Sequence, residues 1–169
     1  MRIKSFAPIS APRPRALVLG TAPSAESLRQ GRCYAHTRNA FWPIMFKIFE
    51  TEFSTDWDVR KQLLASNGIC QWDMAESCVR PGSLDSDMRG VKPNDINSFL
   101  SARPSLTTVF FNGKSAEKFY DRFFERLKNT NYVQLPSTSP AYAAKTFEEK
   151  FRIWNKAFKE LGAPLAKPA

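Results

Sequence analysis

One stretch of the chain, residues 33–45, gathers most of the side chains that could do chemistry. It contains His36, the only histidine in the sequence, followed by Arg38 and Asn39. An almost unbroken apolar run then extends over residues 40–49. Imidazole and amide groups can hydrogen-bond a reacting group or a water molecule. The pattern therefore predicts a polar, functional loop that leads into a buried helix.

Composition and net charge limit the classes of protein to which this chain can belong. Its 169 residues, 43% of them hydrophobic and 24% charged, suit one soluble globular domain. Lysine and arginine outnumber aspartate and glutamate by 25 to 16, which gives a net charge of +9. Such a charge favours a polyanionic partner, because each neutralised phosphate releases counterions. We therefore expect a nucleic acid or a nucleotide as the partner.

Neither a membrane anchor nor a metal or cofactor is expected. No apolar run approaches the ~20 residues that a membrane span requires, and the basic N-terminus lacks the apolar core of a secretory signal. Cys33, Cys70 and Cys78 are odd in number and widely spaced, which is typical of a reduced, cytoplasmic protein. A single histidine and the lack of a Cys-x-x-Cys pair argue against a zinc or iron–sulfur site. The chemistry must then come from ordinary side chains and the backbone.

Four apolar segments separated by helical patterns predict the fold. The expected strands are residues 15–20, 69–74, 106–111 and 132–135. The expected helices are residues 26–29 after a Ser24 cap, 40–49, 56–67, 94–102, 115–127, and 147–161 after a capping box of Thr146 and Glu149. Strands that alternate with helices indicate a parallel sheet with helices on both faces. The sequence therefore predicts an α/β protein, a three-layer α/β/α sandwich with a central four-stranded parallel sheet.

The other segments are expected to lack regular structure. Residues 76–93 are rich in small and polar side chains, and we expect a long loop there. Residues 1–14 are basic and contain prolines, which suggests an N-terminal tail, and residues 163–169 form a C-terminal tail. Residues 15–162 then make up a single domain.

The loops that follow the predicted strands have unusual sequences. They are residues 20–23, the segment from residue 73 onward, residues 112–114 and residues 136–140. In an open parallel sheet, ligands bind outside the carboxyl ends of the strands. We therefore expect these loops to converge on one pocket, together with residues 34–39. The glycine patterns of P-loop and dinucleotide-binding proteins and of the α/β-hydrolase nucleophile are missing, which disfavours those classes.

Five segments, taken in order, resemble the uracil-DNA glycosylase superfamily. They are LGTAPS (residues 19–24), YAHTRNAFW (34–42), SCVRPGSLDS (77–86), FNGKSA (111–116) and LPSTSPA (135–141). The hypoxanthine-DNA (deoxyinosine) glycosylases are the branch to which they are most similar. The resemblance implies a four-stranded parallel sheet between helices, and hydrolysis of the bond between a deaminated base and deoxyribose without metal or cofactor. The iron–sulfur subgroups need four cysteine ligands, which three scattered cysteines do not supply.

The resemblance assigns roles within the opening stretch. Asn39 matches the asparagine implicated in catalysis in this branch, and the alternative is a helix cap, since asparagine caps well. Tyr34 matches the aromatic residue that stacks on the flipped base; the alternative is packing under the first loop. His36 could donate to a phosphate or to the base, or be structural.

The first loop departs from the pattern of the superfamily. Thr21, Ala22 and Pro23 are expected to line the base-binding turn, whose backbone N–H groups can face the base or a water molecule. Relatives place an asparagine or aspartate where this chain has Ala22. This loop is therefore not expected to activate water by itself, and we expect Asn39 to take the larger part in that role.

Other matching residues are expected to contact DNA. The Ser137, Thr138 and Ser139 loop corresponds to the motif that grips the strand near the lesion, although serine-rich loops are often only loops. Tyr142 could be the wedge that fills the vacated stack. The remaining candidates are Arg38, then Asn112 and Lys114 at a helix N-terminus suited to phosphate, and Arg80, Ser83 and Asp85 in the loop characteristic of the branch.

The sequence therefore predicts a monofunctional DNA glycosylase of base excision repair that removes hypoxanthine or uracil and leaves an abasic site. We expect a monomer whose partner is DNA containing a deaminated base. The alternatives are a uracil-preferring glycosylase and a non-catalytic module that binds damaged DNA or a nucleotide.

Overall fold

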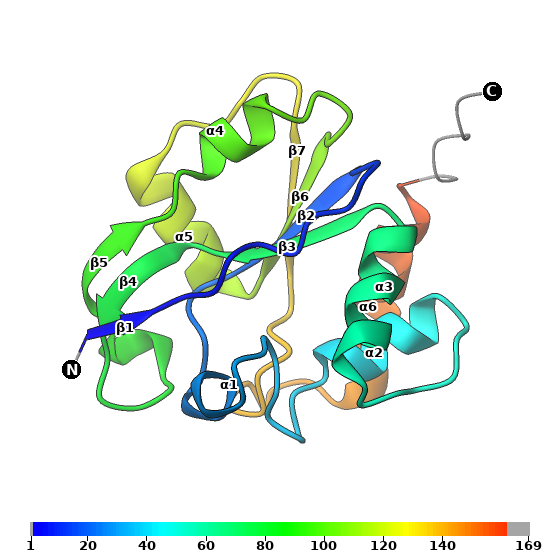
Figure 1. Ribbon diagram of the computed structural model, residues 1–169, viewed down its shortest axis with the longest axis horizontal. Helices are drawn as coiled ribbons and strands as arrows, with labels where there is room; N and C mark the ends of the chain where they lie inside the picture. Colours follow the sequence, from blue (N-terminus) through cyan, green and yellow to red (C-terminus); the bar gives the residue numbers. More distant parts are fainter. Residues whose placement is uncertain (1, 162–169) are drawn as a thin grey trace.

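A computed structural model describes residues 2–161 of the chain. Its centre is a parallel sheet with the strand order β3-β2-β6-β7 (Figure 1). The strands are β2 (Ala16–Gly20), β3 (Ile69–Asp73), β6 (Thr108–Asn112) and β7 (Asn131–Leu135). The predicted four-stranded parallel sheet is confirmed, and each strand lies within two residues of its predicted position.

Burial explains why these segments form strands. Every residue of β2 and of β6 is buried, as is typical of the inner strands of a parallel sheet covered on both faces. Successive side chains of β2 point to opposite faces, so Val18 belongs to one core cluster and Leu17 and Leu19 to another. The edge strand β7 is less buried.

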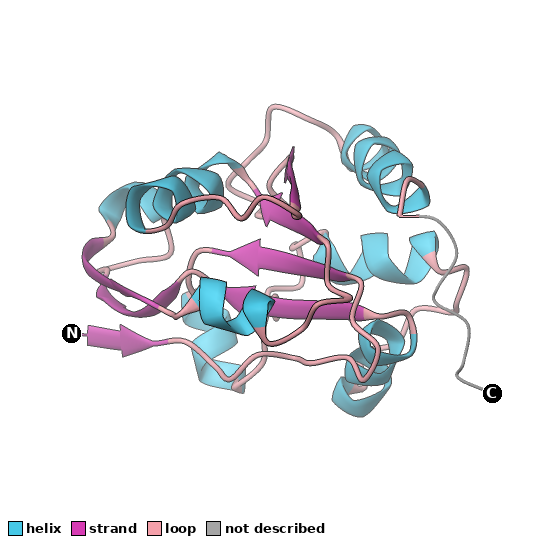
Figure 2. Ribbon diagram, turned by 90° about the horizontal axis from the view of Figure 1, so that it is seen from above, coloured by secondary structure: helices cyan, strands magenta, loops and turns pink. Residues whose placement is uncertain are grey.

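Helices cover both faces of the sheet, which confirms the three-layer prediction. Helices α2, α3 and α6 lie on one side of the sheet, and α4 and α5 lie on the other (Figures 1 and 2). The helices are α1 (Ala25–Gln30), α2 (Phe41–Ile48), α3 (Trp57–Ser66), α4 (Ile96–Ser101), α5 (Lys114–Phe123) and α6 (Phe147–Lys159). None of the helices in residues 2–161 is long and apolar enough to cross a membrane.

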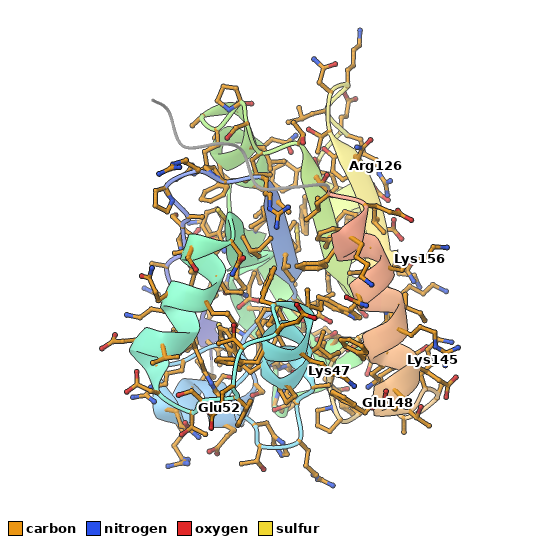
Figure 3. All side chains as sticks on the ribbon, turned by 90° about the vertical axis from the view of Figure 1, so that its right-hand side faces the viewer. Lys47, Glu52, Arg126, Lys145, Glu148 and Lys156 are labelled. Carbon is orange, nitrogen blue, oxygen red and sulfur yellow. The ribbon has the colours of Figure 1, made fainter. Side chains whose placement is uncertain are left out.

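Local signals at the helix ends agree with the sequence. Ser24 caps α1 by accepting a hydrogen bond from the backbone N–H of Ser27. Thr146 and Glu149 form the predicted capping box at the start of α6. Between helices, Lys47 of α2 reaches Glu148 of α6, with 3.3 Å from Nζ to Oε1 (Figure 3).

A second, antiparallel sheet was not predicted. It has the order β1-β4-β5 and consists of β1 (Arg2–Lys4), β4 (Ala75–Val79) and β5 (Arg89–Pro93). The expected long loop at residues 76–93 is therefore wrong over most of its length, because β4 and β5 pair across a short 3-10 helix η1 (Asp85–Asp87). Two register shifts between these strands, and a glycine and a proline within β5, hide the alternation typical of a strand.

Residues 2–14 do not form the N-terminal tail that the sequence suggested. β1 pairs with β4, Ile9 forms a bridge with Gln71 at the edge of the main sheet, and Ala11 is buried. This segment is thus part of the folded domain. The C-terminal tail expected at residues 163–169 lies outside the described residues.

Candidate active site

A cavity of about 400 Å³ opens at the carboxyl edge of the parallel sheet. Residues at the ends of all four strands line it, namely Gly20, Asp73, Asn112 and Leu135, together with the loops that follow β2, β6 and β7. The predicted convergence of these loops on one pocket is confirmed. These loops lie at the lower end of the sheet in Figure 1, around α1.

Most of the residues singled out in the sequence line this cavity. They are Thr21, Ala22, Pro23, Tyr34, Asn39, Ser83, Asp85, Asn112, Lys114, Ser137, Thr138, Ser139 and Tyr142. His36, Arg38 and Arg80 are not among the lining residues. The Nδ1 atom of His36 instead accepts a hydrogen bond from the backbone N–H of Arg38, 3.0 Å away, within a tight turn. A direct contact between His36 and a base in the cavity is therefore not supported.

Asn39 combines the capping role with a place at the cavity. Its Oδ1 accepts a hydrogen bond of 2.9 Å from the backbone N–H of Phe41, the first residue of α2. The next residue, Ala40, donates its N–H to the carbonyl of Thr138, which ties this turn to the loop after β7. Among the described residues the Asn39 amide nitrogen has no acceptor. With its oxygen engaged by the helix, Asn39 offers the cavity an N–H donor.

Tyr34 is held in a strained conformation that brings its ring to the cavity. Its φ angle is 53°, a region that residues with side chains rarely adopt. The ring lies 4.2 Å from the ring of Phe41, centroid to centroid. The hydroxyl is buried and has no hydrogen-bond partner in the described chain. Burial and the nearby Asp73 carboxyl raise the pKa of Tyr34 well above its ordinary value, so the hydroxyl remains a neutral donor.

Asp73, the last residue of β3, is a cavity residue that sequence reasoning missed as a site. Its side chain is only 7% exposed and forms no hydrogen bond with the described residues. An ideal Cβ on Gly20 would lie 2.6 Å from Asp73 Oδ1 and 2.8 Å from Tyr34 Oη, so only glycine leaves room for both groups. Desolvation, with a smaller contribution from Asp85, raises the pKa of Asp73 to about 7. A carboxyl group directly at the end of a buried strand was the signal that could have found it.

Arg80, Ser83 and Asp85 fix the loop between β4 and β5 against the first loop. The Arg80 guanidinium is buried and donates to the backbone carbonyls of Pro23 and Gly82. Thr21 Oγ1 donates to Asp85 Oδ1 at 2.6 Å, and Ser83 Oγ accepts from the N–H of Ala25 at 3.0 Å. Arg80 thus supports the shape of the cavity from behind.

Asn112 holds the loop after β7 in place. Its Nδ2 donates to Thr138 Oγ1 and its Oδ1 accepts from the Thr138 backbone N–H, both at 2.9 Å. Both residues are buried. The expected phosphate contact of the Asn112 side chain is not supported, because the side chain is buried and binds Thr138 through one N–H and its oxygen. Thr138 likewise faces Asn112 and positions the loop.

Lys114, Ser139 and Tyr142 lie at the rim of the cavity. Lys114 is exposed and begins α5, directly after Gly113. Lys150 of α6 donates from Nζ to the Ser139 carbonyl at 3.3 Å, and this Nζ lies 5.3 Å from the centre of the Tyr142 ring. A buried cation therefore lies beneath the serine-rich loop, where it stabilises that loop and adds positive potential.

In residues 2–161, no group of three or more histidine, cysteine, aspartate or glutamate side chains could hold a metal ion. The three cysteines are buried and unpaired.

Comparison with known proteins identifies the family of the chain. The family model described as "Uracil DNA glycosylase superfamily" matches residues 7–161. The chain belongs to this superfamily. Two relatives named hypoxanthine DNA glycosylase come from Methanosarcina species. The protein from Methanosarcina barkeri is 25% identical over 160 residues, which cover 94% of this chain and 99% of the relative.

The other relative, from Methanosarcina acetivorans, is 31% identical over 104 residues, which cover 61% of this chain and 66% of that protein. A solution NMR structure from Methanosarcina acetivorans, described as that of a candidate uracil DNA glycosylase, has a TM-score of 0.81 and 26% identity. The match covers 95% of this chain and 99% of that structure. The superfamily and its α/β/α fold, both predicted from the sequence, are thus confirmed.

Proposed function

We propose that this protein is a monofunctional DNA glycosylase that removes a deaminated base, hypoxanthine in the first place, and leaves an abasic site. The observation that carries the proposal is the cavity at the carboxyl edge, where an aromatic ring, Tyr34, meets the unengaged amide N–H of Asn39. The names of the two Methanosarcina relatives support hypoxanthine as the base. Uracil is the second candidate, because its ring is also flat and also carries a carbonyl beside an N–H.

The chemistry requires an extruded base and donors that face it. As the N-glycosidic bond breaks, negative charge develops on the base and positive charge on the sugar, so preorganised N–H and O–H donors stabilise the transition state. Asn39 Nδ2 is such a donor on a residue that lines the cavity, and the buried Tyr34 Oη lies directly beneath the cavity. Asn39 Oδ1 keeps one lone pair beyond its bond to Phe41, which can accept a hydrogen bond from the attacking water.

The cavity suits a base that has left the helical stack. Its volume of about 400 Å³ lies in the range typical of small-molecule sites. Phe41 packs against the Tyr34 ring, and Tyr34 also lines the cavity, where we propose that it stacks on the base. Flipping costs a few kcal/mol, and least for a mispaired base such as inosine or uracil. Phosphate contacts from Lys114 and Arg38 help to offset that cost.

No Schiff-base step is part of the proposal. Lys114 is the one lysine among the lining residues, and it lies at the exposed rim. Lys150 is directed to the Ser139 carbonyl. Water is therefore the proposed nucleophile, and a single chain, acting as a monomer, supplies the whole lining of the cavity.

A substrate panel tests the function. Excess protein is incubated with duplexes that carry one deoxyinosine, deoxyuridine or deoxyxanthosine, and abasic sites are then cleaved with alkali. We expect scission at deoxyinosine, with deoxyuridine cleaved more slowly, and no covalent adduct after borohydride treatment. Binding should weaken steeply with salt, because phosphate contacts release counterions. Lack of scission on all three duplexes would contradict the proposal that the protein is a DNA glycosylase.

A non-catalytic module that binds damaged DNA is the second candidate, and Ala22 is the observation that favours it. This residue packs against the small cluster of Ala75, Cys78 and Met88 and brings no polar group to the first loop. Salt-sensitive binding to the deoxyinosine duplex without any scission would establish this alternative.

A further inference from the structure

Lys150 is a buried cation that the proposed chemistry does not use. It lies in the first turn of α6 and is only 5% exposed. Its Nζ donates to the carbonyl of Ser139 at 3.3 Å and lies 5.3 Å from the centre of the Tyr142 ring. None of the ion pairs formed within residues 2–161 includes this lysine. The described part of the chain therefore buries a positive charge without a counterion.

The acidic residues next to Lys150 in the sequence are engaged elsewhere. Glu148 binds Lys47 of α2, and Glu149 completes the capping box with Thr146. Both carboxylates complement the positive N-terminal end of the helix dipole, whereas a cation in the first turn opposes it. Burial lowers the pKa of the Lys150 ammonium from its ordinary value of 10.5. The surroundings within the protein thus act against the charged form of this side chain.

Such an arrangement indicates that the missing partner comes from outside the chain. Lysine is rarely buried unless it is paired, because removing an unpaired charge from water costs free energy. The one hydrogen bond to the Ser139 carbonyl holds the loop, but it brings no negative charge to the ammonium. An anion bound beside Lys150 would supply that charge.

The loop above Lys150 has donors for an anion but no charge of its own. Residues 136–144 contain no charged side chain. Ser137 Oγ accepts a hydrogen bond from the N–H of Ser139, and Ser139 Oγ accepts one from the N–H of Ala141. Each hydroxyl therefore keeps its own O–H for donation to a ligand, and both serines line the cavity. The loop can hydrogen-bond a phosphate, while the lysine beneath it can balance the charge.

We propose that Lys150 is a positioning residue for the DNA backbone, and that its ammonium is the counter-charge of a phosphodiester group lying across the loop of residues 136–141. The inference rests on the proposed function and adds a charge that acts through the loop, without contact to the base or the sugar. A buried charge is attracted more strongly than an exposed one to a nearby anion, and salt screens it less. DNA binding then offsets the cost of burying the lysine.

The inference predicts opposite effects of one substitution on stability and on DNA binding. Lys150→Met keeps an unbranched side chain of similar length but removes the charge. Its Tm should be at least as high as that of the wild type, because replacing an unpaired buried charge by an apolar group removes a desolvation cost. Its affinity for DNA should nevertheless fall, because the phosphodiester group loses its counter-charge.

The test is DNA affinity, measured by fluorescence anisotropy over a range of salt concentrations. The two ligands are an undamaged duplex and the same duplex with a stable abasic analogue, neither of which is cleaved. The slope of log Kd against log salt reports the counterions that binding releases. Lys150→Met should weaken binding to both duplexes by about tenfold and lower this slope by about one. Lys150→Arg keeps the charge and should keep the wild-type slope.

Lys156→Met is the matched control. Lys156 lies on the same helix and is exposed at its surface (Figure 3). It is about 9 Å farther than Lys150 from the N-terminus of α6, measured along the helix axis. Removal of this lysine takes away the same charge from the chain, so it reports the effect of net charge alone. Affinity and salt slope should stay close to those of the wild type.

A wild-type salt slope in Lys150→Met would overturn the inference, because a lysine that only holds the loop takes no part in counterion release. A Tm of Lys150→Met well below that of the wild type would also overturn it, since the charge would then stabilise the free protein. A wild type that binds neither duplex would contradict the proposed function as well. Normal binding with an unchanged slope in the variant would sink this inference alone.

Discussion

Replacing Asn39 with alanine is expected to slow base excision by about 10²- to 10³-fold, the usual cost of removing one transition-state donor. Its Nδ2 is an unengaged amide donor at the cavity, and its Oδ1 is fixed by the N–H of Phe41. Ala22 offers no polar side chain that could take over. Single-turnover kinetics on a deoxyinosine duplex measure the effect, since they exclude product release.

A matched variant separates the catalytic role of Asn39 from its structural one. Asn39→Ala also removes the acceptor for the first N–H of α2, which should cost about 1 kcal/mol of stability. Asn39→Ser keeps a side-chain oxygen suited to the cap but lacks the amide donor. We expect the serine variant to unfold at nearly the wild-type urea concentration and yet to excise as slowly as the alanine variant. Recovery of the rate together with the stability would show that Asn39 acts only as a cap.

The parallel sheet could be predicted because each of its strands is a short apolar run between turn residues. β2 and β6 are buried on both faces, so their sequences, ALVLG and TVFFN, leave little ambiguity. The position of the cavity followed from the same fact, since the carboxyl ends of parallel strands meet at one edge. The capping box of α6 could likewise be predicted, because its two residues, Thr146 and Glu149, lie close together in the sequence.

The antiparallel sheet could not be predicted from local pattern. β4 and β5 are partly exposed and shifted in register, and β1 pairs with a strand far along the chain. β1 is only three residues long, and such a pairing depends on tertiary contacts that no short segment encodes. Proline and glycine in β5 then favoured a loop.

Within the site, the type of a residue predicted whether it lies at the cavity better than it predicted its hydrogen-bond partners. Asn112 suited a phosphate contact at a helix N-terminus, but in the fold its buried amide binds Thr138 through one N–H and the oxygen. Asp73 was predicted only as part of the end of a strand, and it was not among the expected site residues. Its burial depends on Tyr34 and Gly20, which are distant in sequence. Such contacts arise from the packing of several loops, so the spacing of residues in the sequence does not predict them.

Replacing Trp154 with alanine is expected to lower the free energy of unfolding by about 3–5 kcal/mol, because the variant leaves a large cavity in the core. This residue of α6 is fully buried and packs against Phe41, the residue that supports Tyr34 and follows the Asn39 turn. Its indole Nε1 donates to the carbonyl of Pro136 at 2.9 Å. Urea denaturation followed by circular dichroism measures the loss of stability.

Trp154→Phe distinguishes the two contributions of this side chain. Phenylalanine fills most of the volume but leaves the partly buried Pro136 carbonyl without its donor, so we expect a smaller loss of about 1–3 kcal/mol. Because Pro136 begins the serine-rich loop, the phenylalanine variant should also bind a deoxyinosine duplex more weakly while remaining folded. If instead Trp154→Phe binds DNA as tightly as the wild type, the hydrogen bond contributes to stability alone. The loop is then positioned by the bonds between Asn112 and Thr138, whose removal in Asn112→Ala should produce the weakening that Trp154→Phe did not.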